Sequence, residues 1–322
     1  MKLLKSKSID FKDVNLLSDA PFMGQSRDEI VVPMERLIVA PMPGLQSSQF
    51  IQTAVALGLS MPIHRFNTPQ EQKALLYLAI NTKKLINSNS KLWVSVGLRD
   101  WKERIGPIKN IMREHEVGVL LDVANGFSKS VKDTLADIYN TYEIDNLFGG
   151  NIHTTAGFDY MERSGAKFIR CGIANGGVCS TKDATGVLRG QISTIKEIFE
   201  GRYEADIVCD GGIKGPADLS KAFLAGADYC MLGSVFSKAS EAQCNQDGSG
   251  IFYGGASAKA KTMAGLEVRY VEGKEVAVDK TEVESLTTIV ETLTDGLKSA
   301  ISYSGFSSLE EAIGNGTFEI VK

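Results

Sequence analysis

The chain has 322 residues, 43% of them hydrophobic and 23% charged, which is ordinary for a globular protein. Its formal net charge is −4 and it has no long basic run, which argues against a nucleic-acid or anionic-membrane partner. No apolar stretch is long enough for a transmembrane helix, and the N-terminal "MKLLKSKSIDFKDVNLL" lacks the apolar core of a signal peptide. We therefore expect a cytoplasmic protein.

The cysteine and histidine content argues against a structural zinc site. None of the five cysteines forms a CxxC pair, and there are only three histidines. In a reduced compartment, most cysteines are small buried hydrophobic residues, and we expect this of most of them here. The five are Cys171, Cys179, Cys209, Cys230 and Cys244.

Short apolar runs alternate along the chain with amphipathic helical segments. The runs predict strands over 37–41, 62–66, 92–97, 118–123, 147–152, 168–172, 205–212 and 227–234. Between them, capping and periodicity predict helices over 47–58, 68–86 and 215–226, among others. Eight strands with intervening helices predict an α/β fold, a (β/α)8 TIM barrel in a single domain over 1–322. A doubly wound open sheet is the alternative, but no GxGxxG follows the first strand.

The residues most suited to chemistry follow the predicted strands directly. Asp122 ends the fourth strand, Asn151 the fifth and Asp210 the seventh, while Cys179 lies in the loop after the sixth. Barrel enzymes build their active sites at this end of the strands. This coincidence predicts a functional site there.

Glycines end the last two predicted strands, in "CDGGIKGPADL" (209–219) and "MLGSVFSK" (231–238). Backbone N–H groups at such positions bind phosphate in many barrels, although the glycines could simply permit tight turns. Asp210 beside them suits a pair of ribose hydroxyls, or it could cap the next helix. Together they favour a phosphorylated sugar as ligand.

Cys179 lies in the glycine-rich stretch "GIANGGVCSTKDATG" (172–186). Taken alone, it is more simply a buried, inert thiol. Its place after the sixth strand favours a nucleophile instead, with Thr181 close by. Glu272, three residues after Arg269, would by itself indicate only a turn.

The chain resembles the IMP dehydrogenase/GMP reductase family, and the reductases more closely. The similarity lies in "LDVANGFS" (121–128), "GIANGGVCSTKDATGV" (172–187), "IVCDGGIKGPADLSKAFLAGADYCMLGS" (207–234), "IFYGGAS" (251–257) and "RYVEGKEV" (269–276). It implies NADPH-dependent reductive deamination of a guanine nucleotide, GMP to IMP plus ammonia. In this reaction, Cys179 forms a covalent adduct at purine C2, and Thr181 and Glu272 handle protons.

The resemblance also implies the remaining parts of the site. It assigns substrate binding to Asp210, Gly212, Gly233, Ser234, Gly177, Ala256, Arg269 and Gly273. It assigns cofactor binding to Asp122, Asn151 and Arg65. K⁺ would be bound by backbone carbonyls of Gly172, Ala174 and Cys179. The assembly implied is a homotetramer, and residues 235–280 would form the active-site loops after the eighth strand.

Three features favour a reductase over a dehydrogenase. The chain has no room for the regulatory tandem-domain insertion that follows the second strand in dehydrogenases. The gap from Ser257 to Glu272 is too short for the dehydrogenase flap. The stretch "KDATGV" (182–187) resembles "KTGV" of the reductases.

Several positions depart from the family pattern. Gly177 stands in place of a phosphate-binding Ser, and Ala174 in place of a Gly. In "YGGAS", Gly255 and Ala256 replace a Met and a Ser that contact the base. A deoxy or modified purine nucleotide is therefore an alternative substrate, and a flapless IMP dehydrogenase using NAD is an alternative activity. A catalytically silent nucleotide-binding protein and an unrelated phosphate-sugar barrel enzyme using Asp122 are further alternatives.

Overall fold

Eight parallel strands form a closed ring in this computed structural model, which describes residues 7–177, 179–201, 203–255, 257–263, 268 and 273–321. The hydrogen-bonded order is β2-β9-β8-β7-β6-β5-β4-β3. Ser60 closes the ring, because its backbone pairs with Leu37 and Val39 of β2 at 2.9 Å. The strands are β2 (Leu37–Val39), β3 (Met61–Ile63), β4 (Leu92–Val96), β5 (Gly118–Leu121), β6 (Leu147–Ile152), β7 (Phe168–Cys171), β8 (Asp206–Asp210) and β9 (Tyr229–Leu232).

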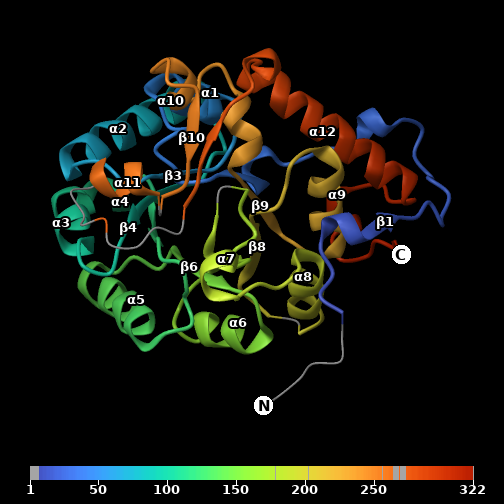
Figure 1. Ribbon diagram of the computed structural model, residues 1–322, viewed down its shortest axis with the longest axis horizontal. Helices are drawn as coiled ribbons and strands as arrows, with labels where there is room; N and C mark the ends of the chain where they lie inside the picture. Colours follow the sequence, from blue (N-terminus) through green and yellow to red (C-terminus); the bar gives the residue numbers. More distant parts are fainter. Residues whose placement is uncertain are drawn as a thin grey trace.

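Helices surround this ring (Figure 1). The main ones are α1 (Ser48–Ala56), α2 (Pro69–Ile86), α3 (Trp101–Ile105), α4 (Lys109–Glu114), α5 (Lys129–Tyr142), α6 (Thr155–Glu162), α8 (Gln191–Glu200), α9 (Pro216–Ala225) and α12 (Leu286–Tyr303). The architecture is the predicted (β/α)8 barrel. Between β3 and β4 the chain forms only α2 and short connections, so no domain is inserted there.

The helix boundaries follow from local capping. Thr68 and Glu71 form a reciprocal capping box at the start of α2, and Pro69 occupies its first position. Ser47 caps α1 by accepting a hydrogen bond from Phe50 N. Gly226 ends α9 with a φ of +118°, a conformation that a side chain would strain. The three helices predicted from the sequence are therefore confirmed.

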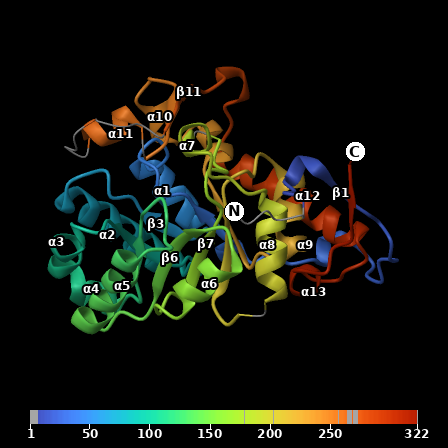
Figure 2. The same cartoon turned by 60° about the horizontal axis from the view of Figure 1, so that its bottom comes forward.

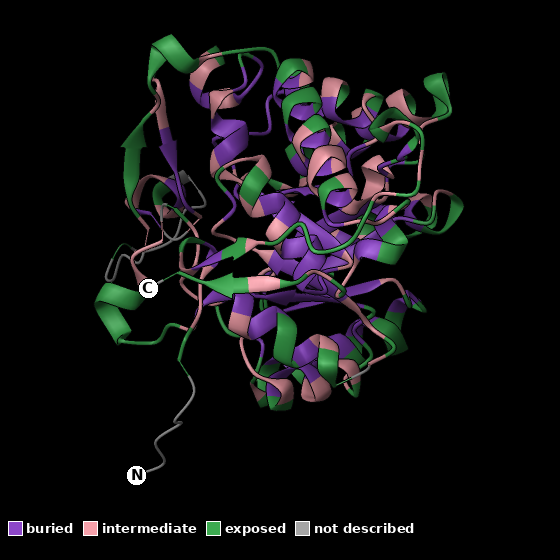
Figure 3. Cartoon of the chain, turned by 90° about the vertical axis from the view of Figure 1, so that its right-hand side faces the viewer, coloured by how far each residue is buried: buried purple, intermediate pink, exposed green. Residues whose placement is uncertain are grey.

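The strands bury both faces (Figure 3), and all of them except β6 are shorter than the apolar runs that predicted them. Aromatic rings of Trp93, Phe148, Phe168 and Tyr229 contact one another near the N-terminal ends of their strands, with centroids 5.2 to 5.6 Å apart. They fill this end of the barrel, as large side chains do in other barrels. The last residues of the predicted runs, such as Gly211 and Gly212, belong to loops at the opposite end.

Smaller elements complete the fold. They are α7 (Thr181–Thr185), α10 (Gln243–Gln246), α11 (Ala258–Met263), α13 (Leu309–Ala312), and two antiparallel pairs, β1 (Val14–Leu16) with β12 (Phe318–Ile320) and β10 (Ile251–Tyr253) with β11 (Glu275–Ala277). The 3₁₀ helices near the site are η5 (Ser234–Lys238) and η6 (Lys280–Glu282). Figure 2 shows α7, α10, α11 and β11 gathered at one end of the barrel. In the described residues, no helix combines the length and hydropathy needed to span a bilayer.

Candidate active site

A cavity of about 200 Å³ opens at the C-terminal ends of the strands. Its walls include Cys179, Asp122, Asp210 and Gly273, which the sequence analysis singled out, and Arg170, which it did not. These side chains and backbone atoms come from the ends of β5, β7 and β8 and from the segment before β11. The barrel thus brings together residues that are widely separated in the sequence.

Cys179 presents its thiol to this cavity from the loop between β7 and α7. A turn closed by the hydrogen bond from Cys179 N to Gly176 O (3.0 Å) fixes the backbone. The sulfur lies 3.2 Å from Thr181 Oγ1. The other four cysteines are buried, whereas Cys179 is partly exposed. Burial also raises the pKa of Cys171 and Cys230, so Cys179 is the cysteine best placed to react.

Two carboxylates flank the thiol cavity and share a buried arginine. Asp122 accepts hydrogen bonds from Arg65 Nε at 3.2 Å and from Arg170 at 3.3 Å. Asp210 Oδ2 lies 3.9 Å from the same Arg170 nitrogen. Burial raises the pKa of Asp210, while Arg170 and Asn151 act in the opposite direction. The arginine therefore holds both carboxylates in place at the mouth of the barrel.

Arg170 was not predicted as a site residue, although the sequence contains a signal for it. It is the one charged residue in the otherwise apolar strand "FIRCG" (168–172), and charged side chains are rarely buried without a partner or a purpose. Its Nε is buried and finds no acceptor within the described part of the chain. A ligand carbonyl in the cavity could satisfy this donor.

Asn151 connects three strand ends. Its Nδ2 donates to Asp210 Oδ2 and to Gly172 O, both at 2.7 Å. Gly172 has a φ of +133°, and a Cβ there would lie 2.3 Å from Asp210 O. Glycine is therefore required where β7 leads into the Cys179 loop. Ala174, in the same loop, also has a left-handed backbone, with a φ of +66°.

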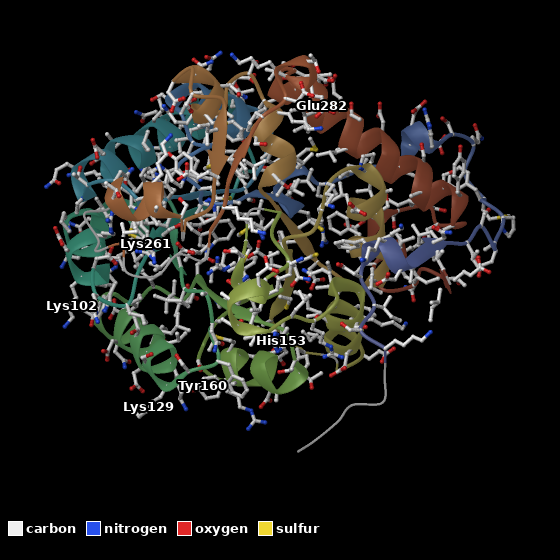
Figure 4. All side chains as sticks on the ribbon, viewed as in Figure 1. Lys102, Lys129, His153, Tyr160, Lys261 and Glu282 are labelled. Carbon is white, nitrogen blue, oxygen red and sulfur yellow. The ribbon has the colours of Figure 1, made fainter. Side chains whose placement is uncertain are left out.

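A second cavity, of about 360 Å³, lies at the far side of the Cys179 loop. Gly177 and Ser234 line it, as do two lysines that the sequence analysis missed, Lys214 and Lys238. Gly212 and Gly233, in the loops after β8 and β9, do not line this cavity. Two acidic residues also face it, and one of them, Glu282, lies 2.7 Å from Lys238 Nζ. In Figure 4, Glu282 and Lys261 lie on either side of the β10–β11 hairpin.

Three predicted site residues lie outside the described residues: Ala256, Arg269 and Glu272. The nearest described neighbour of Glu272 is Gly273, which forms an isolated antiparallel bridge with Cys179. Arg65 follows β3, and its guanidinium contacts Asp122 as noted above. The predicted residues at or after the C-terminal ends of β5, β6, β7 and β8 therefore converge at one end of the barrel.

Comparisons with known proteins identify relatives that match nearly the whole chain. The chain matches the IMP dehydrogenase / GMP reductase domain over residues 29–321. It is 27% identical to GMP reductase of Onchocerca volvulus, over 98% of this chain and 86% of that protein. It is 27% identical to GMP reductase of Ascaris suum, over 95% and 86%.

A third relative, human GMP reductase 2, is 35% identical over 211 residues. That match covers 62% of this chain and 60% of the human protein, so it spans less than two thirds of the relative's length. The family match, by contrast, covers nearly the whole barrel, including every strand of the ring. The chain therefore belongs to the IMP dehydrogenase/GMP reductase family of oxidoreductases.

Proposed function

We propose that the chain is a GMP reductase-type enzyme, which converts GMP to IMP and ammonia with NADPH. The observation that carries the proposal is the partly exposed thiol of Cys179, next to Thr181 Oγ1 and bridged to Gly273 in a barrel-end cavity. The names of the relatives support the same reaction. An accessible thiol can act as the nucleophile in covalent catalysis, and Thr181 places a hydroxyl beside it.

The chemistry divides into two stages. The Cys179 thiolate attacks C2 of guanine, forming a C–S bond, and protonation of the exocyclic amine lets ammonia leave. Hydride then adds to C2, the C–S bond breaks, and the thiolate departs with the electron pair as IMP is released. Thr181, with Glu272, would move the protons on the leaving amine. In total GMP, NADPH and two protons give IMP, ammonium and NADP⁺.

The base, ribose and phosphate of the nucleotide are each assigned to a different part of the site. We place the base in the 200 Å³ cavity beside Cys179 and the phosphate beside Gly177 and Ser234. Asp210 lies between them, and Asn151 contacts only its Oδ2, which leaves Oδ1 for a ribose hydroxyl. Gly212, Gly233, Arg269 and Ala256 are proposed as further substrate contacts from the family resemblance.

The residues around Asp122 suit a nicotinamide cofactor. The unsatisfied, buried Arg170 Nε is a donor for a carboxamide oxygen, and Asp122 lies beside it. Arg65 adds a cation at the rim, where a cofactor phosphate could bind. Asn151, which was predicted to bind the cofactor, donates hydrogen bonds to Gly172 and Asp210. We therefore propose that it positions these two residues beside the Cys179 cavity. NADPH, when bound, supplies the hydride.

Three further features remain proposals: K⁺ binding and a homotetramer, from the resemblance, and a cytoplasmic location, from the sequence. K⁺ would bind the carbonyls of Gly172, Ala174 and Cys179, although Gly172 O already accepts a hydrogen bond from Asn151. The enzyme would act in the cytoplasm as a homotetramer. Replacing K⁺ by Na⁺ in the assay tests the first feature, and sedimentation equilibrium tests the second.

Two matched assays test the proposed activity. Purified protein with GMP and NADPH should consume NADPH and release IMP and ammonia, whereas IMP with NAD should yield no XMP. The reverse result would assign the chain to the dehydrogenases. If GMP were inert but dGMP or a base-modified analogue reacted, the reductase chemistry would stand with another substrate.

A further inference from the structure

Phe66 forms one wall of the Cys179 cavity. It lies in the loop after β3, and only 4% of its surface is exposed. It also lines a neighbouring cavity of about 590 Å³, which extends toward the N-terminal ends of α1 and α2. Phe66 is the residue common to both linings. Its ring therefore stands between the two cavities.

The Phe66 ring also occupies the space beside Gly255. A Cβ on Gly255 would lie 2.5 Å from Phe66 Cζ and 2.9 Å from Cε2, closer than carbon atoms can approach. The φ of Gly255 is not in the left-handed region, so its backbone does not require glycine. The aromatic ring is what requires it. Where the family motif carries a Met, this chain uses Phe66 to fill the space.

The ring is held in place on two sides. The Arg65 guanidinium carbon lies 5.0 Å from the ring centroid, and the His64 ring stacks at 6.4 Å. Phe66 N also donates to His64 Nδ1 at 3.1 Å. Arg65 in turn contacts Asp122, which lines the same cavity. A ring fixed in this way can act as a rigid wall rather than a mobile lid.

We propose that Phe66 determines which base the site accepts, by limiting the Cys179 cavity to guanine without additional substituents. The inference rests on the proposed function, since it assumes that the reacting base lies beside Cys179. It follows that the lack of a side chain at Gly255 does not enlarge the cavity. The substrate class is then an ordinary guanine nucleotide rather than one with a bulky group on the base.

Kinetics with paired substitutions test the proposal. Phe66→Ala should lower kcat/KM for GMP roughly tenfold or more. It should also reduce the preference for GMP over analogues methylated at O6 or C8, because the wall is gone. Gly255→Met alone should abolish turnover, because its side chain meets the ring. The double variant Phe66→Ala/Gly255→Met should recover much of the GMP activity and the preference.

A buried phenylalanine away from the site provides the control. Phe158 of α6 is fully buried and packs on Tyr203, with centroids 4.8 Å apart. Phe158→Ala should lower the melting temperature and leave the ratio of GMP to analogue turnover unchanged. If Phe66→Ala behaved in the same way, or if the double variant were no better than Gly255→Met alone, the proposal would be overturned.

Thiol labelling separates failure of this inference from failure of the proposed function. In the native protein, Cys179 is the accessible cysteine, so iodoacetamide and a bulky N-aryl maleimide report on its cavity. Phe66→Ala should raise the rate with the bulky reagent relative to iodoacetamide, and Phe66→Ala/Gly255→Met should reverse the change. This result is expected even if GMP is not the substrate. If Phe66→Ala left the ratio of the two labelling rates unchanged, Phe66 would not limit the cavity, whichever substrate the enzyme uses.

Discussion

Cys179 and Gly273 face each other in an isolated antiparallel bridge, although one follows β7 and the other precedes β11. Beside the bridge, Lys274 Nζ lies 3.0 Å from Asp183 Oδ2 of α7. Both of these side chains are about half exposed, so this ion pair contributes at most about 1 kcal/mol. The backbone bridge therefore joins the thiol loop to the Glu-Gly segment and closes the cavity on that side.

The hydroxyl beside the thiol is expected to act in the reaction rather than in folding. Thr181→Val keeps the shape of the side chain but removes the oxygen that lies 3.2 Å from the sulfur. We expect kcat to fall roughly 10²-fold with little change in KM, the usual size for a lost proton-transfer group. Steady-state kinetics measure both. Thr288→Val, on the distant helix α12, serves as the control. An equal loss of kcat in the two variants would refute a role for the Thr181 hydroxyl in proton transfer.

Asp210 is expected to select the ribose. Asp210→Asn keeps the contact with Asn151 within reach but weakens the acceptor offered to the sugar hydroxyls. A hydrogen bond to a charged group contributes about 1.5–3 kcal/mol, so the KM for GMP should rise roughly tenfold or more. The preference for GMP over dGMP should shrink at the same time. Asp133→Asn, exposed on α5, should change neither value, and an intact preference in Asp210→Asn would exclude the ribose contact.

Ala174 carries a strain that glycine would relieve. Its φ of +66° lies in the left-handed region, which costs an L-residue about 1–2 kcal/mol. Ala174→Gly should raise the free energy of unfolding by about 0.5–1 kcal/mol, after allowance for the greater entropy of the unfolded chain. Urea denaturation measures the change. Ala222→Gly, inside α9, should instead destabilise the protein by about 1 kcal/mol. If both substitutions lowered the free energy of unfolding, Ala174 would not be strained.

Stability should fall in mildly acidic solution because of His64. Burial, with a smaller contribution from Arg104, lowers the pKa of His64 from 6.5 to about 4. The unfolded chain then binds more protons than the native chain between those values. The contribution of His64 is present in full above pH 6.5 and is lost as the pH falls toward 4, by up to about 3 kcal/mol.

The matched variant is His64→Gln, which keeps an acceptor for Phe66 N but does not titrate. The difference in unfolding free energy between wild type and this variant should depend on pH between 4 and 6.5, and should be constant above that range. Denaturation curves at several pH values give this difference. A constant difference across the acidic range would mean that His64 titrates normally.

The sequence predicted the fold well because its periodicity is local. Buried parallel strands appear as continuous apolar runs, and caps such as Thr68 with Glu71 mark helix starts, so all eight strands and the three named helices were found. The predicted C-terminal ends of all strands except β6 lie beyond the observed ends. Residues such as Gly211 continue the apolar run in sequence but turn away from the sheet, which only the packing of neighbouring loops determines.

The site was predicted in part, for a related reason. Cys179, Asp122, Asn151 and Asp210 each lie at or after the C-terminal end of a strand, so the barrel itself brings them together. Phe66 was assigned to a strand and not to the site, because its role depends on the empty position at Gly255. Contacts between residues so far apart in the chain leave no local pattern. The lysines of the second cavity were missed for the same reason.

If GMP is converted through a covalent bond to Cys179, mass spectrometry should detect the bonded nucleotide during turnover. Wild-type protein mixed with GMP and NADPH should be quenched in acid within the first turnover and digested. The account predicts a nucleotide adduct, GMP less ammonia, on the peptide containing Cys179, and its absence in Cys179→Ala, which should also lose turnover. Undiminished conversion of GMP to IMP by Cys179→Ala would contradict the account.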